Sequence, residues 1–404
     1  MTDIDAILEE LRAAGLFREL RVIASAQGPK VLLDGREVLL LCSNDYLGLA
    51  GDPRLRTAAA EAAERWGAGA GASRLVSGNM SLHARLEEEL AAFKGSEACL
   101  LFGSGFLANT GVIAALAPAG GVVLSDELNH ASIVDGCRLA RAETVVYPHA
   151  DLDGLAHALH THRGRDSVIV TDAVFSMDGD LAPLLGIVEL ARRHNARVVV
   201  DEAHATGVVG PTGRGLVAEL GLEAEVDVVV GTLGKALGSY GAFVCCNARM
   251  AAFLVNRART LIFSTALPPP SLGAALEALR IVREQPEIVT RLHRNARVLR
   301  EGLALPPEPM PIVPLVVGAP DAAMALCEAA LRGGVFAQAI RPPTVPHGSS
   351  RLRLVAMASH REHDLLDAAD LLNASRGSPL TGQGERTPLP HPPGSARGLE
   401  VGRN

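Results

Sequence analysis

Aromatic residues, long apolar runs and clusters of basic charge are all scarce in this chain of 404 residues. Only 3% of its residues are aromatic, and alanine, leucine, valine and 41 glycines dominate. This composition suits alternating helices and buried parallel strands better than a β-sandwich. The formal net charge is −7 and lysines and arginines form no run, so the basic surface that nucleic-acid binding needs is missing. We therefore expect no nucleic-acid partner.

Membrane and export signals are also missing from the sequence. No stretch approaches the roughly twenty consecutive apolar residues of a membrane span, and the N-terminal sequence MTDIDAILEELRAAGLFREL is acidic and amphipathic, unlike a signal peptide. The six cysteines are scattered, with no CxxC pair and no metal-ligand spacing. We expect free thiols, no metal site, no membrane association and a cytoplasmic location.

The first part of the chain predicts an N-terminal arm over residues 1–52. Apolar residues at helical spacing predict a helix over about residues 3–20, and VLLDGREVLLLCSNDY predicts a hairpin around Asp34 and Gly35, a turn dipeptide between two apolar runs. The length and the hydrophobic content of 48% predict one large domain and a smaller one beyond this arm.

The large domain is expected over residues 53–290. Helical stretches such as PRLRTAAAEAAERW alternate there with short β-branched runs: VVLSD, TVVYP, SVIVTDAVF, ARVVVDEAH and VDVVVGTLG. Such alternation predicts an α/β fold, a mostly parallel sheet with helices on both faces. Polar and glycine residues follow each run, and ligands bind at the carboxyl ends of the strands in open α/β sheets. The site is therefore expected at that edge.

The remaining sequence predicts a small α+β domain and a tail. A long helical pattern spans about residues 269–303, and a βαββ-like pattern places the small domain at 291–374. Residues 375–404 are dense in glycine, proline and polar residues without periodicity, which predicts a disordered, non-catalytic tail.

Two residues carry most of the chemical signal. Asp201 ends the apolar run of VVVDEAHATG, and Lys235 follows the next such run inside the glycine-flanked loop TLGKALG. Lys235 alone favours a surface loop lysine, but a lysine in such a loop is also suited to Schiff-base chemistry, and the accompanying Asp201 reverses the preference. A carboxylate beside a pyridine nitrogen makes pyridoxal phosphate an electron sink, which is the role that Asp201 would take. The pair therefore predicts pyridoxal phosphate, held on Lys235.

The order strand-Asp-x-x-His, then strand-x-x-x-Lys, resembles the signature of fold-type I pyridoxal-phosphate enzymes. From about residue 15 to 370 the chain is more narrowly similar to the α-oxoamine synthases. The motifs that carry this resemblance are SNDYLGL, GASRLVSGN, SDELNHASIVDGCR, TDAVFSMDGDLAPL, VDEAHATGVVG, TLGKALG and IRPPTVPHGSSRLRL. The resemblance implies a condensation of an amino acid with an acyl thioester, with loss of carbon dioxide.

The resemblance also assigns residues to the cofactor. Backbone N–H groups of Gly105 and Phe106, where GSGFLANTGV opens a helix, would receive its phosphate. His130 of NHAS would stack on the ring, and it joins Lys235, Asp201 and His204 as a catalytic residue. Ser176 and His204 would bind the phenolic oxygen. Thr232 would bind the phosphate, although a cap at the strand end explains it nearly as well.

Substrate contacts follow from the same resemblance. Arg341 would bind the amino-acid carboxylate, since such groups need charge-rich clamps. Arg18 would meet the acyl substrate, although with Arg21 one helical turn away either residue is also typical of a solvated face. Thr344 would contact the acyl thioester, and Asn44 of SNDYLGL and His130 are also assigned to the substrate. FSTALPP resembles the segment that reaches a neighbouring subunit, which implies a homodimer.

The loop IRPPTVPHGSSRLRL is most similar to that of the family branch that joins L-alanine to a pimeloyl thioester of CoA or acyl-carrier protein. Branches that use glycine with acetyl-CoA or succinyl-CoA remain an alternative. A non-catalytic pyridoxal-phosphate-binding regulator is a weaker one, because both Lys235 and Asp201 are present. Ala205 stands in HATG where the family commonly has glycine, which leaves the substrate preference open.

Overall fold

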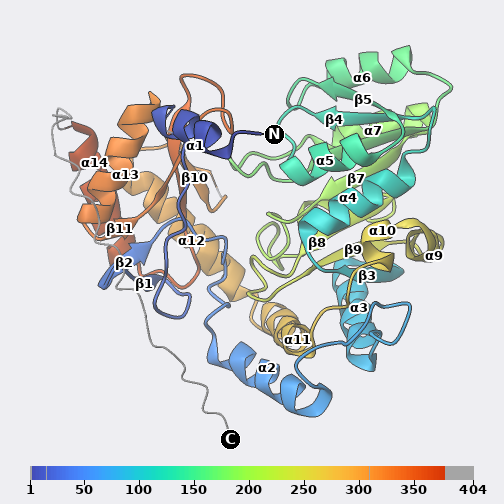
Figure 1. The fold of residues 1–404 in the computed structure, drawn as a ribbon, viewed down its shortest axis with the longest axis horizontal. Coiled ribbons are helices and arrows are strands. Elements are labelled where there is room, and N and C mark those ends of the chain that lie inside the picture. Colours follow the sequence, from blue (N-terminus) through green and yellow to red (C-terminus); the bar gives the residue numbers. More distant parts are fainter. Residues whose placement is uncertain (1, 15, 309, 378–404) are drawn as a thin grey trace, which may run out of the picture.

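A seven-stranded sheet forms the core of the right-hand half of the molecule in Figure 1, a computed structural model that describes residues 2–14, 16–308 and 310–377. Its strand order is β3-β9-β8-β7-β6-β4-β5. The strands β4 to β8 run parallel, whereas β9 is antiparallel to both β3 and β8. Their bounds are Ala98–Phe102 (β3), Val122–Asp126 (β4), Glu143–Tyr147 (β5), Ser167–Asp172 (β6), Arg197–Asp201 (β7), Val228–Thr232 (β8) and Ala242–Cys246 (β9). The predicted mostly parallel α/β sheet is confirmed.

Helices cover both faces of this sheet (Figure 1). Successive residues of β7 face opposite sides, so that Val199 joins one apolar cluster while Val198 and Val200 join the other. One face carries α4 (Gly105–Leu116), α5 (Ala131–Leu139), α9 (Ala248–Arg257) and α10 (Arg259–Ile262). The cluster on the other face includes α3 (Ser81–Lys94), α6 (Leu152–Thr161), α7 (Leu184–His194) and α8 (Leu216–Glu219), and α11 (Pro269–Glu284) packs against α3 and against α2 (Pro53–Trp66).

The N-terminal arm contains the expected hairpin. Strands β1 (Lys30–Leu33) and β2 (Arg36–Leu40) pair antiparallel, and the turn residues Asp34 and Gly35 both have positive φ, as a two-residue hairpin turn requires. Helix α1 (Ile4–Ala13) is shorter than the predicted 3–20. Strand β11 (Val335–Phe336) adds to β2 in parallel, which joins the arm to the C-terminal part of the chain.

The C-terminal region has its own sheet and apolar cluster. Strands β10 (Ile312–Gly318), β13 (Ser350–Val355) and β12 (Gln338–Ile340) form the sheet, packed with α12 (Glu287–Gly302), α13 (Pro320–Arg332) and α14 (Glu362–Gly377). The helical pattern over 269–303 forms two helices, because Pro286 has no N–H to donate to the preceding turn. Residues 375–377 of the expected tail end α14, and 378–404 lie outside the described residues. The predicted domain bounds stay a prediction.

Candidate active site

Polar side chains from neighbouring strands gather at the carboxyl edge of the large sheet. Asp201 ends β7 and pairs in register with Asp172 at the end of β6. Lys235 follows β8, which lies beside β7. The loop that carries Lys235 approaches residues 45–50 closely, since a Cβ on Gly238 would lie 2.6 Å from the backbone nitrogen of Ala50. A glycine at positive φ is therefore needed there, and it holds the lysine loop against SNDYLGL.

Lys235 and His204 are in direct contact. The Lys235 Nζ lies 2.8 Å from His204 Nε2, and the other ring nitrogen, Nδ1, lies 2.6 Å from the hydroxyl oxygen of Tyr46. Burial lowers the pKa of His204 well below its usual value, and the neighbouring Lys235 and Arg353 charges lower it further. Loss of solvation also lowers the pKa of Lys235, although Asp201 and Asp172 oppose this shift. Both groups are therefore biased toward their neutral forms.

Asp201 is held as a buried carboxylate on the face that carries α4. Its Oδ2 accepts a hydrogen bond of 2.6 Å from Asn109 Nδ2, and its Oδ1 accepts one of 2.7 Å from the Ala203 N–H. Asn109 also donates to Ser132 Oγ at 2.9 Å. Burial, followed by the charge of Asp201, raises the pKa of Asp172 well above its ordinary value. Asp172 is therefore biased toward its protonated form.

The remaining residues predicted to bind the cofactor surround this centre. Gly105 and Phe106 open α4, whose N-cap Ser104 accepts from the Leu107 N–H at 3.2 Å. His130 caps α5, where its Nδ1 lies 2.7 Å from Ser132 Oγ and its backbone N–H donates to Asp172 Oδ2 at 2.7 Å. The helix N-termini and the acids thus face one edge of the sheet.

Thr232 and Ser176 have contacts of other kinds. The Thr232 hydroxyl donates to the Gly241 carbonyl and accepts from the Gly234 N–H, both at 3.1 Å, so it closes the lysine loop as a strand-end cap. The Ser176 carbonyl accepts a hydrogen bond from Arg353 Nε. The cofactor contacts of both side chains stay predictions.

The predicted substrate residues lie farther out in the chain's loops. Asn44 is half-buried, and its Oδ1 lies 3.5 Å from the Tyr46 hydroxyl. Arg341 is half-buried directly after β12, and its carbonyl accepts from the Thr344 N–H at 3.1 Å. Thr344 and Arg18 are both exposed. Their substrate contacts stay predictions.

Arg353 is a site residue that the sequence analysis missed. It lies on β13, it is 7% exposed, and its Nη2 is 3.5 Å from the Tyr46 hydroxyl oxygen. Its charge acts on both His204 and Lys235. Arg351, two residues earlier on the same strand, forms an ion pair with Asp178. The loop that carries Ser176 and Asp178 is therefore bound to β13 at two points.

A buried ion pair lies behind the site, on the opposite side of β7. Lys94 at the end of α3 pairs with Glu202, and these side chains are 2% and 0% exposed. Lys94 also donates to the Arg214 carbonyl, and Glu202 Oε1 accepts from the Val217 N–H at 2.7 Å. This pair holds the backbone directly after Asp201.

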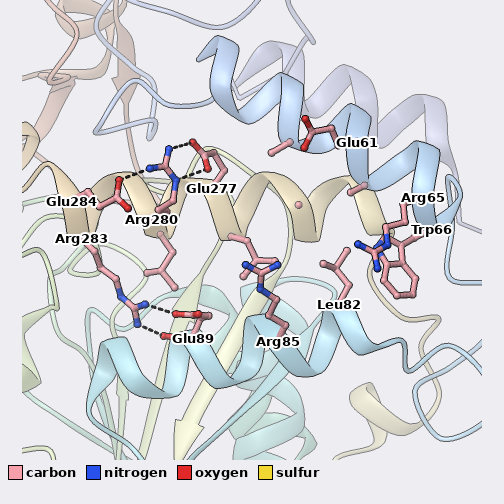
Figure 2. A pocket seen from close by; sticks show the side chains of 15 residues that line it. Glu61, Arg65, Trp66, Leu82, Arg85, Glu89, Glu277, Arg280, Arg283 and Glu284 are labelled. Atoms are coloured by element: carbon pink, nitrogen blue, oxygen red, sulfur yellow. Dashed lines mark hydrogen bonds and ion pairs between the residues drawn. The ribbon is translucent and has the colours of Figure 1, made fainter.

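A separate cavity of about 540 Å³ lies between α2, α3 and α11 (Figure 2). Ion pairs line it, Arg280 with Glu277 and Glu284, and Arg283 with Glu89. None of the predicted site residues lines this cavity. The candidate active site is therefore the sheet edge around Lys235, and the described residues contain no cluster suited to a metal ion. No helix within the described ranges is long and apolar enough to cross a bilayer.

This architecture agrees with a family model for aminotransferase class I and II, which matches residues 36–372. Because the match covers more than half of the sequence, the chain belongs to that family. It is also 53% identical over 367 residues to a curated 8-amino-7-oxononanoate synthase from Geobacter sulfurreducens, which covers 89% of this chain and 94% of the relative. The predicted resemblance to the α-oxoamine synthases is thereby confirmed.

Solved structures of similar fold include enzymes of the same kind. A structure of SPT with a PLP internal aldimine is 32% identical with a TM-score of 0.87, covering 92% of this chain and 96% of that one. An 8-amino-7-oxononanoate synthase from Francisella tularensis is 26% identical with a TM-score of 0.72, covering 83% and 97%. The predicted fold-type I architecture is confirmed.

Proposed function

We propose that the chain is a pyridoxal-phosphate-dependent acyltransferase, an 8-amino-7-oxononanoate synthase of biotin biosynthesis. It joins L-alanine to a pimeloyl thioester of CoA or acyl-carrier protein and releases carbon dioxide and the free thiol. The observation that carries the proposal is the contact of Lys235 Nζ with His204 Nε2 at 2.8 Å, beside the buried carboxylate of Asp201. The similarity to the Geobacter sulfurreducens synthase supports this substrate pair.

The residues present fit pyridoxal phosphate. A lysine amine biased toward its neutral form suits the aldehyde, and the buried Asp201 carboxylate suits a protonated ring nitrogen. The start of α4 offers unpaired helix N–H groups to a phosphate, and a Cβ at Gly105 would meet nothing within 4 Å, so the approach is open. When bound, the cofactor supplies the electron sink for loss of the amino-acid carboxyl group.

Each residue of the site then has its own role. Asp201, fixed by Asn109 and the Ala203 N–H, holds a proton on the ring nitrogen through its charge. The Lys235 amine takes and returns protons at the α-carbon of the amino acid, a role that its lowered pKa favours. When the cofactor is bound, His204 and Ser176 would hold its phenolic oxygen and His130 would lie against its ring. Thr232 and the N–H groups of Gly105 and Phe106 would hold its phosphate.

The amino-acid carboxylate has two candidate arginines. Arg341 is the residue expected from the sequence, but Arg353 lies within the contact network of Tyr46, His204 and Lys235. We assign the carboxylate to Arg353, and Arg341, Arg18, Asn44 and Thr344 to the acyl substrate side. Ala205 is fully buried in the main apolar cluster.

The active enzyme is a homodimer. Loop 71–79 lies against the FSTALPP segment, where Ser73 bridges Thr265, and both carry exposed apolar side chains: Leu75 (56%), Val76 (79%) and Phe263 (70%). Exposed large apolar side chains on two paired segments support a subunit interface at this place. Sedimentation of a monomer at assay concentrations would contradict this assignment. The cytoplasmic location stays a prediction from the sequence.

The function is tested by supplying L-alanine labelled in its carboxyl carbon together with pimeloyl-CoA or pimeloyl-acyl-carrier protein. We expect labelled carbon dioxide and free thiol in equal amounts, and the two donors compared directly identify the carrier. Glycine with acetyl-CoA or succinyl-CoA serves as the comparison. A preference for glycine, with no reaction of pimeloyl thioesters, would overturn the substrate assignment and leave only the wider family.

The carboxylate assignment is tested by alanine titration without acyl donor, followed in the cofactor absorbance. Arg353→Lys should weaken alanine binding tenfold or more, because an ammonium lacks the two-bond fork and a hydrogen bond to a charged group contributes about 1.5–3 kcal/mol. Arg341→Lys and Arg351→Lys are the matched controls and should bind alanine normally. If Arg341→Lys alone weakens binding, the carboxylate belongs to Arg341.

A further inference from the structure

Tyr46 connects the protein interior to the active-site lysine. It belongs to SNDYLGL, its side chain is 0% exposed, and its hydroxyl oxygen lies 2.6 Å from His204 Nδ1. The opposite nitrogen of the same ring, Nε2, lies 2.8 Å from Lys235 Nζ. Tyr46, His204 and Lys235 therefore form one continuous chain of hydrogen bonds.

The direction of these hydrogen bonds follows from their donors. The Arg353 guanidinium has only donors, so at 3.5 Å the Tyr46 oxygen accepts from its Nη2. The single hydroxyl hydrogen of Tyr46 has two possible acceptors, His204 Nδ1 at 2.6 Å and Asn44 Oδ1 at 3.5 Å. The hydroxyl hydrogen therefore lies in the shorter of these contacts, the one with His204 Nδ1. Nδ1 therefore accepts, and a neutral His204 carries its hydrogen on Nε2.

This arrangement determines the state of the lysine. The Nε2–H of His204 points at Lys235 Nζ, which accepts it only through a lone pair, as the free amine. Burial supports each step, because it raises the pKa of the Tyr46 hydroxyl and lowers the pKa values of His204 and Lys235. Each shift therefore favours the state that the hydrogen bonds require: a protonated hydroxyl, a neutral imidazole and a free amine.

Charged and titratable groups from the other elements also face Lys235 and His204. The carboxyls of Asp201 on β7 and Asp172 on β6 favour a charged lysine, whereas Arg353 on β13 opposes it. His130 at the start of α5 acts in the same sense as Arg353 on His204. Asp172 has a raised pKa, which weakens its pull on the proton of Lys235. Desolvation and the ordered hydrogen bonds therefore prevail over the remaining acid, Asp201.

We propose that Tyr46 is a positioning residue that holds His204 as its Nε2–H tautomer and thereby raises the fraction of Lys235 present as the free amine that attacks the cofactor aldehyde. The amine lone pair forms the C–N bond, and the aldehyde oxygen leaves as water with the two hydrogens of the amine. The proposal rests on the proposed cofactor. It concerns the capture of that cofactor, a step that precedes any substrate.

The test compares two buried tyrosines. Tyr46→Phe removes only the hydroxyl, and Tyr147→Phe makes the same change in a tyrosine that is 3% exposed at the end of edge strand β5. Each protein, freed of cofactor, is mixed rapidly with pyridoxal phosphate over a range of pH. The rate of imine formation is followed by absorbance, and circular dichroism checks the fold.

Wild type and Tyr147→Phe should show the same pH dependence. In Tyr46→Phe the curve should move upward by about one pH unit, which lowers the rate near neutrality about tenfold, since a pKa higher by one lowers the free-amine fraction tenfold. Above the ordinary lysine pKa the three rates should converge. An unchanged curve, or a rate lowered equally at every pH, would overturn the proposal.

A second measurement needs no variant. Nitrogen NMR of the wild-type protein without cofactor should show the His204 hydrogen on Nε2, and a hydrogen on Nδ1 would overturn the proposal even if Tyr46→Phe does not fold. Failure of the wild type itself to capture pyridoxal phosphate would instead remove the proposed function. The two failures are therefore distinguishable.

Discussion

Two lysine sites lie on opposite sides of the same strand, and they use their lysines in different ways. Asp201 and Glu202 are consecutive, so their side chains point to opposite faces of β7. Glu202 forms an ion pair with Lys94 in a fully enclosed space. Asp201 is instead bound by Asn109 and faces Lys235, whose nearest partner is a neutral imidazole nitrogen.

The difference teaches how a buried lysine becomes reactive. Lys94 meets a carboxylate, a backbone carbonyl and, at 3.4 Å, the Thr206 hydroxyl, all of which stabilise an ammonium. Lys235 instead contacts a ring nitrogen of His204, and burial lowers the pKa of the Lys235 amine. The chain has only one further lysine, Lys30, which is 40% exposed and pairs with Asp364. One chain therefore contains a structural lysine, a surface lysine and the lysine that we propose is reactive, which allows matched substitutions.

The largest effect is expected from Lys235→Met on turnover. This substitution should lower the rate about 10³-fold or more, because it removes both the amine that anchors the cofactor and an acid–base group. Carbon dioxide release measures it, with Lys30→Met as the control. Borohydride reduction and peptide mapping of the wild type should place the pyridoxyl label on Lys235. A label on Lys94 or Lys30 would reverse the distinction between the two buried sites.

The second effect concerns stability. Lys94→Met should destabilise the protein by roughly 3–5 kcal/mol, because it leaves the Glu202 carboxylate buried without a partner. Urea unfolding measures the change, and Lys30→Met should cost less than about 1 kcal/mol, as exposed ion pairs do. Adding Glu202→Gln to Lys94→Met should restore part of the loss. Equal stability of Lys94→Met and wild type would show that this ion pair is dispensable.

The smallest expected effect is an increase in the stability of the folded protein. Lys235→Met should stabilise the cofactor-free protein at neutral pH, since each unit by which folding lowers a pKa corresponds to about 1.4 kcal/mol. A lysine whose folded pKa is lowered binds fewer protons when folded, so stability rises with pH up to the ordinary pKa of 10.5. The gain should therefore shrink as pH rises toward that value. A gain that does not change with pH would indicate better packing by methionine instead.

The sequence predicted the strands whose pattern is local. The runs that form β4 to β8 are short, β-branched and bounded by polar residues, so their sheet and the edge that carries Asp201 and Lys235 were predictable. Strands β3 and β9 were not predicted, because ACLLF and AFVCC have no flanking pattern that distinguishes a strand from a buried helix segment. The antiparallel β9 depends on tertiary pairing with both of its neighbours.

Tyr46 and Arg353 show what local patterns cannot predict. Arginines alternate with leucines in SRLRLV, a pattern typical of a strand with one solvated face, yet every residue of β13 is buried. Arg353 lies inside because Ser176 and Tyr46, far away in the sequence, bind it. Tyr46 meets His204 for the same reason. Such contacts arise only when the fold brings distant segments together.

The two bonds between β13 and the loop of Ser176 and Asp178 have a consequence for recombination between relatives. Arg351 and Arg353 match this loop, although more than 170 residues of sequence separate them from it. A chimera that takes residues 312–355 from another family member would place that relative's β13 side chains against the original loop of Ser176 and Asp178. It should retain activity only where residues 176–178 are exchanged at the same time. Around this site, two segments that are distant in the sequence must therefore be exchanged together, and exchange of one contiguous domain is not enough.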